Sequence, residues 1–173
     1  MSKLNYKYIG ANVKRLREAL GLSQHNLSTL IPVSKRTIAN IEAGNPDISI
    51  AHLNLLLEFF NLRDSNDLSK KDLIIKESFR EKLISYHEIH NPDFNNLLNK
   101  TPTIVYAVKY KLLNSLFFKE FREIIEIRSF FEEFGWEYKG SSITNALIRM
   151  PNLIERKKHE SKGNTNLYKR REE

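Results

Sequence analysis

The segment of residues 21–44 constrains the fold of this chain most, because it predicts two short helices joined by a tight turn. Ser23 and Ser34 are suited to cap the N-termini of these two helices. The apolar side chains at helical spacing, which we expect to be buried, are Leu27, Leu30, Ile31, Ile38 and Ile41. The second helix begins with polar and basic side chains, and a helix presented in this way can enter the major groove of duplex DNA.

Two further helices are expected, one before this pair and one after it. The apolar residues before it recur at spacings of four, three and four, and they are Ile9, Val13, Leu16 and Leu20. Gly21 follows them and suits a left-handed C-terminal cap. After a loop at residues 44–47, a helix should begin at Ser49 or Ile50, and its expected core face is Leu53, Leu56, Leu57 and Phe60. Residues 1–63 therefore predict a compact bundle of four or five helices.

The positive charge of the chain is concentrated at its two ends. The 173 residues suffice for one average domain or two small ones, and they carry a net charge of +7. Residues 1–63 hold 8 Lys and Arg against 4 Asp and Glu, residues 64–100 hold 6 against 7, and residues 101–173 hold 14 against 10. A charge excess can simply keep a protein soluble, but two basic ends around a neutral middle favour a polyanionic partner.

Several classes of protein are disfavoured by the composition. The chain has no cysteine, so disulfides and thiolate metal sites are excluded. No apolar run approaches a membrane span and the first residues do not resemble a signal peptide, so we expect a cytoplasmic protein with no membrane partner. We expect neither an enzyme nor a cofactor, because there is no phosphate-binding glycine loop and no acid–histidine cluster. His87 and His90 do not have the spacing of a zinc motif; a solvated helix end is expected there, and no metal site.

The spacing of residues 8–62 resembles the Cro/Xre helix-turn-helix family of phage repressors. The positions that carry this resemblance are Leu22-Ser23-Gln24, Leu27, Val33-Ser34, Thr37-Ile38, Ile41-Glu42 and Gly44. The resemblance implies that Gln24 binds a phosphate and that Ser34 and Thr37 contact the DNA backbone or bases. It implies base reading by Lys35, Arg36 and Asn40, and residue chemistry agrees, since Arg or Lys pairs with guanine and Asn with adenine. It also implies a structural salt bridge between Arg17 and Glu42, and a homodimer on a twofold DNA site.

The chain departs from the family pattern at two places. Pro32 stands where relatives usually have a glycine in the turn, and proline cannot adopt the positive φ of that glycine. The turn between the two helices must therefore be rebuilt. The loop of residues 45–49 has no basic residue, so minor-groove reading by an arginine is not expected there.

The middle of the chain, residues 64–100, is expected to be a linker and a connecting helix. Residues 63–69 are polar and turn-rich, which is typical of a domain boundary. One helix is predicted from Asp72 to about His90, ended by Asn91-Pro92, with a stripe of Ile75, Phe79, Leu83 and Tyr86. This stripe could form a subunit interface or pack on one of the two basic units, and the sequence leaves both open.

Residues 101–173 predict three helices followed by a β-hairpin. We expect a helix start at Thr101-Pro102, a second apolar face closed by Gly135, and a third helix from Ser141 or Ser142. The residues of the first two apolar faces are Ile104, Val105, Val108, Leu112 and Leu116, then Ile127, Phe130, Phe131 and Phe134. The segment of residues 122–126 is either a short strand or more helix. Residues 153–159 and 165–170 predict two strands with a turn between them.

This order resembles a winged helix-turn-helix domain in architecture, without a diagnostic motif. The resemblance implies a possible second DNA site, with Ser142, Thr144, Asn145 and Arg149 in the major groove. The hairpin residues Arg156, Lys157, Lys158 and Lys162 would then meet phosphates or the minor groove. The alternative is an oligomerisation or effector domain with solvated charge.

The sequence thus predicts a mainly α fold: an N-terminal Cro/Xre-type bundle, a connecting helix, and a C-terminal winged-helix-like domain with a β-hairpin. The function that it favours is a sequence-specific transcriptional regulator, a repressor, which binds double-stranded DNA as a homodimer. The alternative is an antitoxin-like or adaptor protein whose main role is to bind another protein, with DNA binding for autoregulation.

Overall fold

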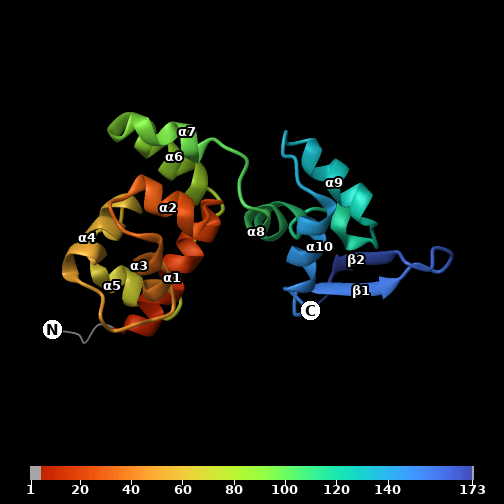
Figure 1. Ribbon diagram of the computed structural model, residues 1–173, viewed down its shortest axis with the longest axis horizontal. Helices are drawn as coiled ribbons and strands as arrows, with labels where there is room; N and C mark the ends of the chain where they lie inside the picture. Colours follow the sequence, from red (N-terminus) through yellow and green to blue (C-terminus); the bar gives the residue numbers. More distant parts are fainter. Residues whose placement is uncertain (1–4, 173) are drawn as a thin grey trace. The chain divides into compact units, whose positions relative to one another are not determined.

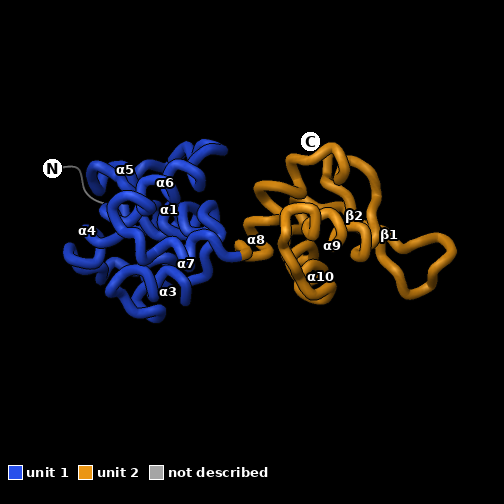
Figure 2. The backbone as a smooth tube through the Cα atoms, turned by 90° about the horizontal axis from the view of Figure 1, so that it is seen from above, with its two compact units in different colours: residues 1–100 blue, residues 101–173 orange. Residues whose placement is uncertain are grey.

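The computed structural model describes residues 5–172, which form two compact units that divide between Lys100 and Thr101 (Figures 1 and 2). Each unit has its own cluster of buried apolar side chains. In the described part of the chain, no helix has the length and hydropathy needed to span a membrane. The mainly helical fold with one small C-terminal hairpin is as predicted.

The regular elements described in the first unit are all helices. They are α1 (Tyr6–Ala19), α2 (Gln24–Leu30), α3 (Lys35–Glu42), α4 (Ile50–Phe59), α5 (Ser65–Ser69), α6 (Phe79–His90), the 3-10 turn η1 (Pro92–Phe94) and α7 (Asn95–Leu98). The hydroxyls of Ser23 and Ser34 each accept a hydrogen bond from the backbone N–H three residues on, which confirms the two predicted caps, and Ser49 caps α4 in the same way. Gly21 has a φ of 73°, as its capping position requires.

The predicted apolar positions form the core of this unit. The buried residues that the periodicity identified are Ile9, Val13, Leu16, Leu20, Leu27, Leu30, Ile31, Ile38, Ile41, Leu53, Leu56 and Phe60. Leu57 is only partly buried, and Phe59 is buried beside Phe60. The core face of α4 is therefore rotated slightly from the expected one.

The turn between α2 and α3 is built without a residue of positive φ. Ile31 is extended, and the Val33 N–H donates to the Ile31 carbonyl at 2.7 Å, across Pro32. This is a three-residue turn around the proline, whose fixed φ is compatible with it. The rebuilt turn expected from Pro32 is thus present, and α2 and α3 keep their predicted order and caps.

The single helix predicted from Asp72 to His90 is wrong in its first part, because α6 begins only at Phe79. Side chains of α1 bond backbone carbonyls just before and within this segment, which holds it against α1. The Asn12 side-chain amide donates to the Leu68 and Lys70 carbonyls at 2.8 and 2.7 Å. The Arg15 guanidinium donates to the Leu73 carbonyl at 2.9 Å. Tertiary contacts therefore override the local helical pattern here.

The stripe on α6 packs against the core of the first unit. Leu83 is buried there, and Ile75, Phe79 and Tyr86 are partly buried against the same cluster. Of the two arrangements left open by the sequence, the structure shows packing on a basic unit. Residues 64–100 are consequently part of the first compact unit.

The expectation that His87 lies at a solvated helix end is wrong. His87 is 1% exposed, its Nε2 donates to the Phe59 carbonyl at 2.8 Å, and its ring stacks on that of Phe59. The Asn91 side-chain amide lies 3.1 Å from its Nδ1, which accepts. Burial lowers the pKa of His87, and the hydrogen bond to the Phe59 carbonyl opposes this only in part. His87 is a neutral core residue.

The second unit consists of short helices followed by an antiparallel hairpin. Its elements are α8 (Ile104–Tyr106), the π-helical segment η2 (Ala107–Leu112), the 3-10 turn η3 (Phe117–Lys119), α9 (Ile124–Glu132), α10 (Gly140–Ile148), β1 (Ile154–Lys158) and β2 (Asn166–Arg170). The strands pair from Ile154 opposite Arg170 to Lys158 opposite Asn166. Arg122 makes a β-bridge to Tyr168, so both descriptions of residues 122–126 hold in part: a bridge first, then α9.

Several predicted details of this unit are wrong. The first helix begins after Thr103, so Pro102 lies before the helix and not at its first position. The Pro102 carbonyl accepts a hydrogen bond from the Tyr138 hydroxyl at 2.8 Å. The third helix begins at Gly140, before the two serines. Leu116 is 76% exposed and Phe134 is 44% exposed, so the two apolar faces are shorter than expected. The helix η2 ends at Leu112, which removes Leu116 from the buried side.

Candidate nucleic-acid interface

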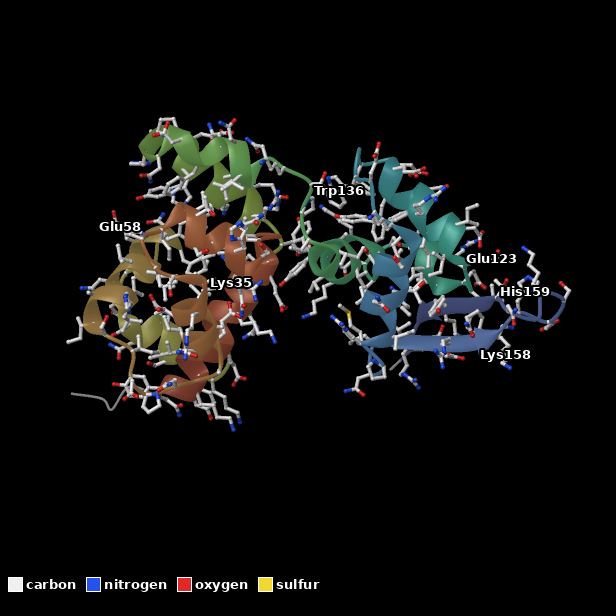
Figure 3. All side chains as sticks on the ribbon, in the orientation of Figure 1. Lys35, Glu58, Glu123, Trp136, Lys158 and His159 are labelled. Carbon is white, nitrogen blue, oxygen red and sulfur yellow. The ribbon has the colours of Figure 1, made fainter. Side chains whose placement is uncertain are left out.

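The helix α3 presents its polar side outward because its apolar side is anchored in the core. Ile38 and Ile41 are 0% and 1% exposed. The predicted base-reading residues Lys35, Arg36 and Asn40 are all exposed, and Lys35 is labelled in Figure 3. The structure therefore places these three side chains on one accessible helix, at its start and along its free face.

The N-terminus of α3 is closed by its own cap. The Ser34 hydroxyl accepts from the Thr37 N–H at 3.1 Å and also bonds the Thr37 hydroxyl at 2.9 Å. Ser34 is exposed and Thr37 is half-buried. Neither α2 nor α3 has an acidic residue in its first turn, so the positive ends of both helix dipoles are uncompensated by carboxylates of their own. This arrangement suits a phosphate.

A close approach of α1 fixes the position of α3. A Cβ atom at Gly10 would overlap the carbonyl oxygen of Ile41 and would lie 2.8 Å from the Gly44 nitrogen. Only glycine allows α1 to lie this close to the end of α3. Gly44 itself has a φ of 79°, which ends α3 directly after this contact.

The predicted salt bridge between Arg17 and Glu42 is present and nearly buried. The Arg17 Nε and Nη2 lie 2.5 and 2.8 Å from the two carboxylate oxygens of Glu42, and Nη1 donates to the Leu22 carbonyl at 2.7 Å. The side chains are only 9% and 5% exposed. This bidentate pair joins α1 to the last residue of α3, which orients the helix.

The Gln24 side chain is directed at this salt bridge. Its amide donates to Glu42 Oε2 at 2.9 Å, and the residue is half-buried. The phosphate contact predicted for Gln24 would therefore have to use the rest of the amide or the backbone N–H. The sequence pattern identified the residue, but its contact to Glu42 depends on the fold.

A second candidate surface consists of α10 and the hairpin. Asn145 and Arg149 are exposed on α10, while Ser142 and Thr144 are half-buried. On β1, Arg156 and Lys158 are exposed and two residues apart, so they lie on one face of the hairpin. Figure 3 labels Lys158.

Lys157 points to the other face of the hairpin. Its Nζ lies 4.5 Å from the centroid of the Phe121 ring, and the Lys169 Nζ lies 4.9 Å from the same ring. These are cation–π contacts within the unit. The four hairpin cations named by the sequence therefore do not share one face.

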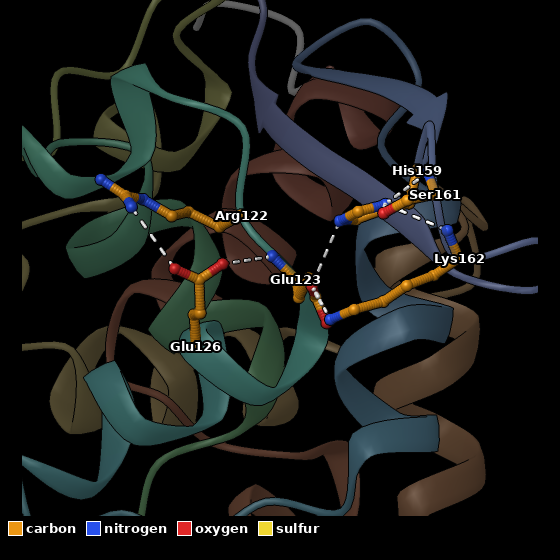
Figure 4. A network of polar contacts seen from close by, with 6 residues as sticks. All are labelled: Arg122, Glu123, Glu126, His159, Ser161 and Lys162. Atoms are coloured by element: carbon orange, nitrogen blue, oxygen red, sulfur yellow. Dashed lines mark hydrogen bonds and ion pairs between the residues drawn. The ribbon is translucent and has the colours of Figure 1, made fainter.

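Lys162 is held by a partner that the sequence analysis did not identify. Its Nζ lies 2.5 Å from Glu123 Oε1, directly before α9, and His159 Nε2 lies 3.6 Å from the same oxygen (Figure 4). The hydrogen bond from Lys162 is the main cause that lowers the pKa of Glu123. The backbone N–H groups of Ser161 and Lys162 donate to His159 Nδ1 at 3.1 and 3.3 Å. This network ties the hairpin turn to α9.

Among the described residues, no three His, Asp and Glu side chains come together as a set of metal ligands. What the surface offers instead is two groups of exposed polar and basic side chains, one on α3 and one on α10 with β1.

A comparison with known proteins matches the part of the chain that contains α3. The helix-turn-helix family model matches residues 13–68, from the middle of α1 to the end of α5. No curated protein and no solved structure matches the chain. The matched segment contains α2, the Pro32 turn and α3, and leaves the second unit outside the match. Residues 13–68 are therefore a helix-turn-helix of the Cro/Xre type, which supports a DNA-binding transcriptional regulator.

Proposed function

We propose that this protein is a sequence-specific transcriptional repressor that binds duplex DNA as a homodimer and reads the major groove with α3. The observation that carries the proposal is the accessibility of Lys35, Arg36 and Asn40 on a helix whose isoleucines are buried. These residue types are able to bond guanine and adenine edges. It acts by binding rather than by catalysis, and needs no cofactor to do so.

The second unit supplies a further DNA contact in this proposal. Asn145 and Arg149 on α10 face the groove, while Arg156 and Lys158 on the hairpin meet phosphates. Lys162 is omitted from that set because Glu123 already neutralises it. Phosphate contacts of this kind raise affinity evenly across sequences and make it depend on salt.

Selection of bound sequences from a random duplex library tests the proposal with the full chain. The expected product is a twofold-symmetric site with half-sites about 10 base pairs apart or a multiple of that spacing. An asymmetric site would refute the homodimer, and a pool without enrichment would refute sequence-specific binding altogether.

The two surfaces are distinguished by salt titration of single variants. Lys158→Ala should weaken binding equally on cognate and random DNA and reduce the salt slope by about 1. Lys82→Ala, which removes an exposed lysine from α6, is the matched control and should change neither. If Lys158→Ala behaves like the control, the hairpin does not contact DNA.

A specific observation favours an alternative, an adaptor or antitoxin-like protein that binds another protein. Leu116 and Ile125 of the second unit are 76% and 60% exposed, and a shallow groove nearby is lined by Phe117, Ile125 and Phe130. Exposed apolar patches of this kind often mark protein contacts. Copurification of a stoichiometric protein that is lost in the Ile125→Glu variant would favour this alternative over the repressor.

A further inference from the structure

A cavity of about 780 Å³ opens at the end of the hairpin away from its turn. Its walls come from η2 and the residues after it, from Lys119 at the end of η3, and from the end of β2. Four of the lining residues are cations: Lys109, Lys119, Arg170 and Arg171. One lining residue, Glu172, is acidic. The cavity is therefore strongly basic, and none of these four cations belongs to the surfaces described above.

The two arginines are held at the wall by the fold. The Arg170 guanidinium donates to the Leu113 carbonyl at 3.3 Å, and Arg170 lies opposite Ile154 in the hairpin register. The Arg171 N–H donates to the Leu153 carbonyl at 2.8 Å. Their backbone positions are thus set by strand pairing before any ligand arrives.

Three of the cavity cations, Lys119, Arg170 and Arg171, differ from other cations of this unit in their partners. Lys162 is paired with Glu123, and Lys169 lies 3.4 Å from Glu155. Within residues 5–172, no carboxylate lies within ion-pair distance of Lys119, Arg170 or Arg171. With Glu172 as the one carboxylate among the lining residues, these three cations leave an excess of positive charge in a concave site, which favours an anionic ligand.

Apart from the polar Asn114, the rest of the lining is apolar and aromatic. Leu113 and Leu153 line the cavity together with Tyr110, whose ring stacks on that of Tyr106 at a centroid distance of 5.2 Å. A cavity of this size, with apolar walls and a few charged groups, has the character of a small-molecule site. We propose that it binds a small ligand that combines phosphate groups with a planar ring, the chemical class to which nucleotides belong.

Phosphate could reach this cavity from a free nucleotide or from the backbone of bound DNA. The concave shape and the apolar wall favour the free ligand, because a DNA backbone presents phosphates without an accessible ring. Arg171 also lines a second groove, together with Ile148 of α10 and Arg156 of β1. This inference rests on the proposed function, in which α10 and β1 contact DNA. A ligand that binds Arg171 lowers the positive charge beside Arg156 on that surface, so the ligand regulates DNA binding.

Isothermal titration of the full chain with ATP, without metal and at low salt, tests the site. We expect saturable binding, and Lys119→Glu should weaken it about tenfold or more, since it replaces a charge-assisted contact by repulsion. Lys158→Glu makes the same charge change on β1, outside the cavity, and should leave ATP affinity nearly unchanged. No saturable binding, or an equal loss in both variants, would overturn the proposal.

A parallel titration with duplex DNA separates this inference from the proposed function and distinguishes the two phosphate sources. Duplex binding without ATP binding refutes the nucleotide site alone, and ATP binding without duplex binding refutes the DNA-binding function alone. A loss of duplex affinity in Lys119→Glu, with ATP affinity unchanged, would assign the cavity to the DNA backbone and so contradict the free-ligand site. Competition of ATP with duplex in the wild-type chain supports the regulatory link through Arg171.

Discussion

Replacing Arg17 by methionine should destabilise the first unit severely. The substitution leaves the Glu42 carboxylate, 5% exposed, without the two hydrogen bonds that it accepts from the guanidinium. Gln24 remains its only partner in the described structure, at 2.9 Å. Breaking a buried ion pair in this way costs about 3–5 kcal/mol, a large part of the roughly 5–15 kcal/mol that stabilises a typical domain. The folded-to-unfolded ratio should fall by a factor on the order of 10² to 10⁴.

Urea denaturation with two probes measures this loss. Far-UV circular dichroism follows the helices of both units, while fluorescence of Trp136, the only tryptophan of the chain, follows the second unit. We expect Arg17→Met to move the unfolding transition of the first unit to lower urea concentration and to leave the transition that Trp136 reports in place. The matched control is Lys70→Met, because the Lys70–Asp67 pair is exposed and its loss should have little effect.

Removing both charges should have a much smaller effect than removing one. In Arg17→Met combined with Glu42→Leu no uncompensated charge remains, so we expect most of the stability to return or even to exceed that of the wild type. A cost below about 1 kcal/mol for Arg17→Met, as expected for a solvated surface pair, would show that the pair is not a buried one in energetic terms. A double variant less stable than Arg17→Met would contradict the expected cost of an unpaired buried charge.

Three further results follow from the structure. Burial lowers the pKa of His87, so protonation favours the unfolded chain, and the free energy of unfolding should fall as the pH drops below the pKa of about 6.5 that His87 has in the unfolded chain. Urea denaturation at about pH 5 and pH 8 measures this fall, which His87→Gln should reduce. Gly10→Ala should destabilise the first unit by about 1–3 kcal/mol or more and weaken DNA binding, because its Cβ overlaps the Ile41 carbonyl; unchanged urea and DNA titrations would contradict this. Glu123→Gln should release Lys162, and hydrogen exchange at the amides of the hairpin turn should become faster; unchanged protection would show that the ion pair does not hold the turn.

The helix-turn-helix could be predicted from the sequence because its signals are local. Ser23 and Ser34 cap helices that start within one residue of them, and the spacing of Ile38 and Ile41 specifies which side of α3 is buried. The strands were also predicted, because alternation and a turn lie within one short segment. Even the effect of Pro32 follows from a property of the residue itself.

What the sequence could not show depends on contacts between distant residues. Residues 70–78 are not helical, and the segment before them is held to α1 by Asn12, more than fifty positions earlier, which bonds the carbonyls of Leu68 and Lys70. The Phe59 carbonyl that fixes His87 comes from another helix. Lys162 and Glu123 are 39 positions apart, and no local pattern indicates that they pair.

The basic cavity of the second unit illustrates the same limit. Lys109 and Lys119 lie before α9, while Arg170 and Arg171 lie after β1. The sequence showed an excess of positive charge in residues 101–173 but could not separate residues on the hairpin face from those that line a cavity. That separation depends on the strand register, which places Arg170 opposite Ile154.

The most direct test of the account is the base preference of the Arg36→Ala variant. Its affinity is measured on the selected wild-type site and on duplexes that change one base pair at a time, with Lys82→Ala as the control. If α3 reads the major groove, Arg36→Ala loses about 1–3 kcal/mol on the selected site and becomes indifferent to the base pair at one position. An equal loss on every duplex, or no loss at all, would contradict the central claim that α3 reads DNA sequence.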